Sequence, residues 1–461
     1  MKTNRSKYKH YPSYKPSGVE WLGEIPEHWE VRKLKWILQE SLKYGANESG
    51  ELGNDNQPRY IRITDFNDGG ELVNDNVKTL PYELAKDFLL KDGDILFARS
   101  GATVGKTFQF KNYNGLACFA GYLIKATPDE KIIDSDFLYY FTKSRVYIEW
   151  KNLIFIQSTI QNIGADKYKV LPITLPPLPE QRAIANFLGR ETAKIDVLVE
   201  KEGKMIELLK EKRSALITKA VTKGLDPNVK LKPSGVEWIG EIPEYWDARK
   251  IKFNAHKIGS GKTPLGGANA YVDEGILFIR SQNVQYNRLE LEDSVFIDGK
   301  TDAELFSSRL LKHDVLLNIT GASIGRTCIY NSNQRANVNQ HVCIIRVNES
   351  RLLPNFLVYF IISATCQNYI LNTQNGSSRE ALTFNQIGNL FTPFPSLSEQ
   401  KIIASFLDRE TTKIDKLIEK IGHQIELLKE YRQSLITSAV TGKIDVSTML
   451  NTSVREEVSP P

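Results

Sequence analysis

Cysteine and long apolar runs are scarce in this 461-residue chain. It has four cysteines, and none forms a CxxC pair or stands beside a histidine pattern, which argues against both a zinc knuckle and a disulfide framework. No stretch reaches the roughly 18 apolar residues of a membrane helix, and the basic N-terminus lacks the apolar core of a signal peptide. We therefore expect no metal site, export signal or membrane span, and reduced cysteines indicate the cytoplasm.

Catalytic motifs are also missing. The sequence contains no G-x-S-x-G, no H-E-x-x-H and no Asn-Pro-Pro-aromatic tetrapeptide. GATVGKT at residues 101–107 resembles a phosphate-binding loop, but three residues separate its glycines where that loop requires four. Asp129 with Glu149 and Lys151 imitates a nuclease signature by residue type alone. We interpret the glycines as a tight turn and expect no catalysis by the chain itself.

Composition indicates a globular protein with more than one domain. The chain is 41% hydrophobic and 25% charged, which is typical of folded domains. Its net charge of +5 permits a polyanionic partner without requiring one.

An internal duplication organises the sequence. Residues 15–35 and 232–252, here called the clasp segments, agree at about 16 of 21 positions, and residues 175–227 agree with 394–446 at about 32 of 53. Between these repeats lie two blocks, 36–174 and 253–393, that agree only at scattered landmarks. Two copies of one frame therefore surround two divergent blocks, and because Asp445 corresponds to Asp226, which leads into the second clasp, the chain should close back toward Lys15.

The repeated blocks 175–227 and 394–446 carry apolar residues at helical spacing. Pro179 suits a first helical turn, Ser396 and Glu399 have the spacing of a capping box, and Gly224 and Gly442 stand where helices should end. We expect rods over about residues 191–221 and 410–440, packed antiparallel as a coiled coil. The divergent blocks combine short strands and short helices, so the fold class is α+β with a pseudo-twofold duplication.

The divergent blocks contain side chains of the types that read DNA. Arginine recognises guanine, and asparagine or glutamine recognises adenine, whereas lysine, serine and threonine hold phosphates. The candidates near glycines or turns are Arg62, Arg99, Ser100, Lys106, Gln157, Thr159, Gln161, Arg280, Ser281, Asn283, Asn318, Arg326, Asn339, Gln340, Ser378 and Arg379. The duplicated pairs Trp21/Trp238 and Trp29/Trp246 favour a structural role for the clasps.

The chain resembles the specificity subunit of type I restriction-modification enzymes. The resemblance rests on GVEWLGEIPEHW in the first clasp, on PPLPEQ at residues 176–181 and on the two IELLKE runs that begin at Ile206 and Ile425. It implies a target-recognition domain in residues 1–174, a helical spacer in 175–227, a second recognition domain in 228–393, a second spacer in 394–446 and a flexible tail in 447–461.

The resemblance also implies a function. Each recognition domain would read one half of a bipartite site in double-stranded DNA, while the paired helices set the spacing and dock two modification subunits. Those partners would use S-adenosylmethionine, and restriction subunits would use ATP and Mg; this chain would bind no cofactor. The helical residues assigned to docking are Ile184, Leu188, Ile195, Ile403, Leu407 and Ile414. Two alternatives remain open: a duplicated coiled-coil scaffold without sequence-specific DNA contact, and a nuclease in its own right.

Overall fold

The computed structural model divides the chain into two compact units that do not follow chain order. It describes residues 8–53, 56–67, 70, 72–101, 103–156, 162–374 and 381–446. The first unit joins Met1–Glu202 to His423–Pro461, and the second is Gly203–Gly422. Each unit thus contains one divergent block with part of each long helix.

The two repeated blocks form helices longer than the sequence suggests. α5 (Leu178–Lys223) has 46 residues and α10 (Leu397–Val440) has 44. Both begin 13 residues before the expected starts at 191 and 410. The reason is that the residues just after Pro177 and Ser396 already form the first helical turn. The Gln181 amide donates to the Pro176 and Ile132 carbonyls, and Gln400 repeats this with Pro395 and Arg351.

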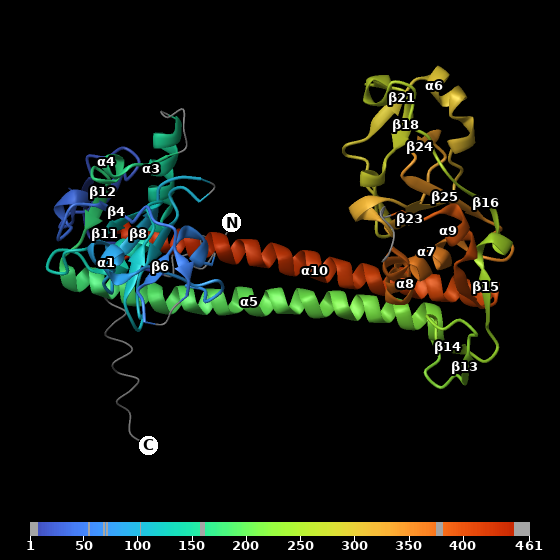
Figure 1. Ribbon diagram of the computed structural model, residues 1–461, viewed down its shortest axis with the longest axis horizontal. Coiled ribbons are helices and arrows are strands. Elements are labelled where there is room, and N and C mark those ends of the chain that lie inside the picture. Colours follow the sequence, from blue (N-terminus) through green and yellow to red (C-terminus); the bar gives the residue numbers. More distant parts are fainter. Residues whose placement is uncertain are drawn as a thin grey trace. The chain divides into compact units, whose positions relative to one another are not determined.

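In each unit the two helices pack antiparallel, as predicted (Figure 1). In the first unit Arg432 of α10 forms an ion pair with Asp196 of α5 at 2.8 Å, and in the second Arg213 of α5 pairs with Asp415 of α10 at the same distance. The two ion pairs join matching positions of the two copies. The duplication is therefore present in the contacts as well as in the sequence.

The helix ends agree with the glycine signals. Gly224 and Gly442 have φ of +73° and +71°, the left-handed conformation that glycine adopts without strain. Only half of the expected capping box forms at α10, because Ser396 accepts the Glu399 backbone N–H while the Glu399 carboxylate binds the second clasp instead.

The first divergent block builds two four-stranded sheets, ordered β4-β11-β8-β9 and β10-β6-β7-β5. All pairs are antiparallel except β10 with β6. The strands are β4 (Lys43–Tyr44), β5 (Glu51–Leu52), β6 (Arg59–Ile61), β7 (Lys78–Thr79), β8 (Ile95–Ala98), β9 (Thr107–Gln109), β10 (Ala117–Phe119) and β11 (Leu123–Ala126).

The second divergent block repeats both sheets, in the orders β16-β25-β22-β23 and β24-β18-β21-β17. It adds one hairpin, β19 (Val284–Gln285) with β20 (Arg288–Leu289). The other strands are β16 (Ala255–Ser260), β17 (Tyr271–Val272), β18 (Ile276–Ile279), β21 (Val295–Ile297), β22 (Val315–Asn318), β23 (Thr327–Ile329), β24 (Ala336–Val338) and β25 (Val342–Val347). Divergent sequences therefore share one α+β architecture.

Short helices complete each divergent block. In the first unit these are α1 (Tyr82–Ala85), α2 (Ser135–Thr142), α3 (Arg145–Ile156) and α4 (Ala165–Tyr168). In the second unit they are α6 (Gly299–Glu304), α7 (Pro354–Ile362), α8 (Ala364–Gln374) and α9 (Phe384–Asn389). The start of α3 binds Thr437 of α10, and the start of α8 binds Thr218 of α5 in the same way.

The clasp segments are structural, as predicted. Each forms a hairpin, followed by a strand that pairs with the strand before a long helix. In the first clasp, β1 (Tyr14–Pro16) and β2 (Glu24–Pro26) form the hairpin, and β3 (Glu30–Lys33) pairs with β12 (Pro172–Leu175). In the second, β13 (Leu231–Pro233) and β14 (Glu241–Pro243) form the hairpin, and β15 (Asp247–Lys250) pairs with β26 (Phe391–Phe394). Trp29 and Trp246 are fully buried and donate to Glu180 and Glu399 at 3.1 and 3.0 Å. Buried indoles of this kind are not available for stacking.

The chain closes on itself within the first unit. The Asp445 N–H donates to the Lys9 carbonyl at 2.8 Å, the Tyr14 hydroxyl donates to the Gly442 carbonyl at 3.0 Å, and Lys443 reaches the Glu24 carbonyl. The described ends are therefore neighbours, as the duplication predicted. The expected tail, 447–461, lies outside the described residues.

Candidate nucleic-acid interface

Three connections meet at one edge of the sheets in each divergent block. They follow β6, β8 and β10 in the first block and β18, β22 and β24 in the second. In the first, the β10–β11 connection binds the end of β6 through Ala120 N–H to Ile61 O, and the Arg99 N–H after β8 donates to Tyr122 O. In the second, Asn339 N–H donates to Ile279 O and Ile319 N–H to His341 O. We call these the reading edges of the first and second domains.

The glycine-rich segments form tight turns at the reading edges. They join the antiparallel strands β8 to β9 and β22 to β23. All four glycines, at 101, 105, 321 and 325, have positive φ, so the turn interpretation is confirmed. Lys106 is exposed, whereas Arg326 is half-buried and donates to Gln285 at 2.8 Å.

Arg62 and Arg280 occupy the same position after β6 and β18, before the short 3-10 turns Ile63–Asp65 and Ser281–Asn283. Arg62 forms an ion pair with Asp65 at 2.7 Å, which raises the pKa of the guanidinium. Arg280 instead donates to the Asp293 carbonyl at 2.6 Å. Both are partly exposed, so each can present its remaining N–H groups to a phosphate or a base.

Arg99 and Ser100 lie at the base of the first turn. The Arg99 guanidinium stacks on the Tyr44 ring, 4.8 Å from its centre, and its Nε is buried without a hydrogen-bond partner. Ser100 forms an isolated bridge with Asn162. The structure thus brings Arg62, Arg99, Ser100 and Lys106 to the same edge of the first domain.

In the second domain Asn283 and Asn318 are not available to DNA. Both are buried; Asn283 accepts the Arg280 N–H and donates to the Glu290 carbonyl, and Asn318 donates to the Ser281 carbonyl at 2.7 Å. The Asn283 amide and the Asn318 nitrogen serve the backbone, whereas Asn318 Oδ1 is buried without a hydrogen-bond partner. Ser281, Asn339 and Gln340 stay at the reading edge with partial or full exposure.

Five candidates lie outside the described residues. These are Gln157, Thr159, Gln161, Ser378 and Arg379. Their described neighbours Asn162 and Ala381 form bridges with Ser100 and Thr320, which are reading-edge residues.

Sequence reasoning missed two aromatic residues at the first reading edge. Tyr122 is 68% exposed and helps to line a hollow of about 440 Å³ together with Arg62 and Lys78. Tyr44 is also exposed and supports Arg99. The sequence signal that could have identified Tyr44 is the glycine that follows it. Gly45 lies against the Phe119 carbonyl, and a Cβ there would come within 2.3 Å of that oxygen.

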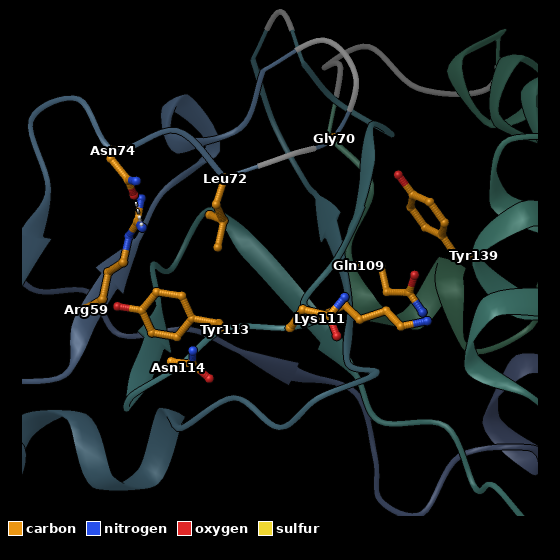
Figure 2. A pocket seen from close by; sticks show the side chains of 10 residues that line it. Arg59, Gly70, Leu72, Asn74, Gln109, Lys111, Tyr113, Asn114 and Tyr139 are labelled. Carbon is orange, nitrogen blue, oxygen red and sulfur yellow. Dashed lines mark hydrogen bonds between the residues drawn. The ribbon is translucent and has the colours of Figure 1, made fainter. Parts of the chain in front are cut away.

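A second hollow, of about 610 Å³, lies at the opposite end of β6 (Figure 2). Arg59 is buried there, and its guanidinium donates to the Asn74 side chain at 3.0 Å and to the Val73 carbonyl. The Tyr113 ring covers the same guanidinium. These contacts hold the connection between β6 and β7, so we assign Arg59 a structural role.

The six helical residues assigned to partner docking are buried within the chain. Ile184, Leu188 and Ile195 belong to the core of the first unit, and Ile403 and Leu407 to that of the second. Ile414 is also buried. These side chains stabilise the chain itself and are not exposed to a docking partner.

Among the residues that the structure describes, no cysteine is activated and no metal-binding cluster forms. Burial raises the pKa of Cys118, Cys328 and Cys343 to about 12, which makes a poor thiolate. Within the described ranges no three histidine, cysteine, aspartate or glutamate side chains could hold a metal ion together. None of the described helices is long and apolar enough to cross a membrane.

Known proteins share this architecture. A solved chain from a study titled "Structural basis underlying complex assembly and conformational transition of the type I R-M system" superposes with a TM-score of 0.71 at 15% identity, covering 90% of this chain and 98% of that one. The HsdS subunit of Thermoanaerobacter tengcongensis gives 0.52 at 16% identity, covering 91% and 98%. These similarities show a common fold.

Sequence relatives cover nearly the whole chain. The putative type I restriction enzyme MjaX specificity subunit of Methanocaldococcus jannaschii is 27% identical over 93% of this chain and 96% of its own length. The EcoKI specificity subunit of Escherichia coli K12 is 22% identical over 92% and 90%. The family model described as type I restriction modification DNA specificity domain matches residues 26–207 and 243–427. Two matched domains of this extent show that the chain belongs to the family of type I restriction-modification specificity subunits.

Proposed function

We propose that the chain directs a restriction-modification complex to a bipartite DNA sequence, each recognition domain reading one half. The observation that carries this proposal is the pair of reading edges. Corresponding strands build the two edges in the same order. The edges nevertheless present different side chains, such as Tyr122 in the first and His341 at the equivalent position of the second. One frame with two sets of exposed groups suits two half-sites of different sequence.

The test is an exchange of one divergent block. Residues 36–174 are replaced by the corresponding block of another family member, and methylated sites are mapped in genomic DNA from cells that also carry the partner subunits. We expect one half-site to change and the other to stay. The reciprocal exchange of residues 253–393 is the matched control and should change only the other half-site. Unchanged half-sites in both chimaeras would support a scaffold instead.

Catalysis belongs to partner subunits in this proposal. The four buried thiols support it because burial raises the pKa of each one and leaves little thiolate at neutral pH. S-adenosylmethionine would be used by the modification subunits, and ATP and Mg by the restriction subunits. The purified chain should therefore neither methylate nor cleave DNA when supplied with methyl donor and magnesium, and activity from the chain alone would favour a nuclease.

Two modification subunits would dock on exposed leucines of the helix pair. In the first unit these are Leu198 of α5 and Leu427 of α10, and each precedes a residue that packs on the core, Val199 and Leu428. The second unit has Leu417 and Leu208 at the matching positions. When two helices pack antiparallel, residues that come one position before a packed residue on each helix lie on the same face of the pair. An apolar patch that occurs once per unit suits two copies of one partner.

Charge substitutions test this docking. The pair L198E and L427E should remove one modification subunit and leave the other, and L208E with L417E should do the same on the second unit. K201E with K429E, on exposed positions of the same helices, is the control. The stoichiometry of the complex, measured by native mass spectrometry, should fall from two modification subunits to one; an unchanged stoichiometry excludes the leucines as the docking site.

The continuous helices would set the gap between half-sites. Inserting four residues in α5 after Glu202 and four in α10 after Gly422 lengthens both helices by about 6 Å. Because one DNA step is about 3.4 Å, the gap should grow by one or two base pairs while the half-sites stay the same. Methylation mapping measures both, and changed half-site sequences would contradict this role.

A further inference from the structure

Four side chains form a continuous hydrogen-bonded chain at the second reading edge. The Thr263 hydroxyl donates to Gln340 Oε1. Gln340 Nε2 lies 2.8 Å from His341 Nε2, and His341 Nδ1 lies 2.6 Å from Thr320 Oγ1. The segment after β16, the β24–β25 connection and the end of β22 are thereby tied together.

The directions of these hydrogen bonds follow from the donors. In the orientation shown, the amide nitrogen donates to His341 Nε2, so the imidazole proton lies on Nδ1 and Nδ1 donates to Thr320. The inverted amide pairs equally well, because its oxygen accepts from His341 Nε2–H and its nitrogen donates to the Thr263 hydroxyl. In either orientation Thr263 and His341 each hold one end of the Gln340 amide.

The fixed amide still has capacity for a ligand. An amide has two N–H donors and two oxygen lone pairs, and the chain uses one of each. Gln340 is exposed, so the second N–H and the second lone pair face solvent. Because the side chain is already ordered, binding costs it less conformational entropy than it would cost a mobile glutamine.

We propose that Gln340 reads an adenine in the second half-site through this preset donor and acceptor, with Thr263 and His341 as positioning residues. Adenine presents an N6 donor and an N7 acceptor side by side in the major groove, and glutamine matches them with two hydrogen bonds. This inference rests on the proposed function, because it requires the reading edge to face DNA.

The first domain has a glycine at the position of this reader. Leu123 pairs with Ala98 as Val342 pairs with Asn318, so Gly121 corresponds to Gln340. A Cβ at Gly121 would lie 1.9 Å from the Asn47 side-chain oxygen, and the glycine itself has no side chain with which to read a base. The first half-site therefore serves as an internal control in any experiment on Gln340.

Methylation mapping with the complete complex tests the proposal. Q340A should lower discrimination at one A·T pair of the second half-site by on the order of tenfold and leave every other position unchanged. Q340E should move the preference at that pair toward cytosine, because a carboxylate accepts from the cytosine amino group. H341F keeps the glutamine but removes the side chain that holds one end of its amide, so discrimination at the same pair should fall without moving to cytosine.

Gln334 provides the matched control. It is an exposed glutamine of the same domain, before the start of β24 and so at the opposite end from Gln340. Q334A should leave the whole recognition sequence unchanged. A Q340A complex with an unchanged second half-site, or a second half-site without an A·T pair, overturns the inference. If the wild-type chain directs no bipartite methylation, the proposed function itself fails, so the two failures are distinguishable.

Discussion

At the scale of single residues, burial separates amides that support the backbone from amides that can meet DNA. Asn318 donates to the Ser281 carbonyl and is fully buried, while Gln340 is exposed on the same edge. Ala98 stands at the Asn318 position in the first domain. The side-chain amide group therefore has two roles within one domain.

Asn318 should matter for stability and not for base choice. N318A removes the donor to the Ser281 carbonyl together with the buried, unpartnered Oδ1, so it should cost about 0.5–1.5 kcal/mol. Urea unfolding of the full chain should show this loss, while methylation mapping shows the wild-type half-sites. A changed second half-site with unchanged stability would contradict the assignment.

Lys143 gives the first unit a pH dependence. Burial, together with the nearby charges of Arg432 and Lys106, lowers its pKa from 10.5 to about 8, and its ammonium donates to the Thr107 carbonyl at 2.6 Å. Between these pH values the unfolded chain binds more protons than the folded chain, so the contribution of Lys143 to stability rises with pH.

The comparison is with K143M, which cannot titrate. Relative to this variant, the wild-type chain should gain stability as the pH rises from about 8 to about 10, and urea unfolding at both values measures the difference. A stability difference that is the same at both pH values would show that the Lys143 pKa is not lowered. Variant and wild type share all other titrating groups, so these cancel.

At the scale of elements, each long helix ends against a clasp tryptophan. A Cβ at Gly224 would lie 3.4 Å from Trp246, an ordinary contact, whereas at Gly442 it would lie 2.3 Å from Pro26 and 3.2 Å from Trp29. The two glycines share one conformation but differ in surroundings. Comparing the same substitution at Gly224 and Gly442 therefore separates the cost of backbone strain from the cost of steric overlap.

Alanine at these two positions should destabilise by different amounts. G224A should cost about 1–2 kcal/mol, the strain of a left-handed alanine, and G442A should cost more because Pro26 must also move. G203A, inside α5 with open space around its Cβ position, should stabilise by about 0.5–1 kcal/mol. Thermal unfolding gives the order, and equal costs for G224A and G442A would contradict the contact with Pro26.

At the scale of the whole molecule, the described ends of the chain meet where Lys9 pairs with Asp445. The matching junction in the middle of the chain, residues 225–230, is mostly exposed. The first unit thus contains segments from both ends of the sequence. We therefore expect the contacts between these segments to determine the fold, and not their order along the chain.

A circular permutant should therefore fold. Val446 is joined to Tyr8 by a short glycine-serine linker, since paired strands lie only about 5 Å apart, and new ends are opened at Asn228. Such loop sites tolerate new termini. The permutant should direct methylation to the wild-type sequence, whereas opening the chain within α5 at Leu209, which is buried, should abolish folding. Failure of both permutants would show that the chain order itself is required.

The sequence alone determined the duplicated frame, the antiparallel helices, the structural clasps, the glycine turns and the closure of the chain. These features depend on local periodicity and on repeated residues, which can be read directly. It could not place the helix starts, because Gln181 and Gln400 belong to the first turn only through contacts with distant carbonyls. Nor could it separate Asn318 from Gln340. Burial and hydrogen-bond partners arise from segments far apart in the chain, so only the tertiary structure decided which polar side chains remain available to DNA.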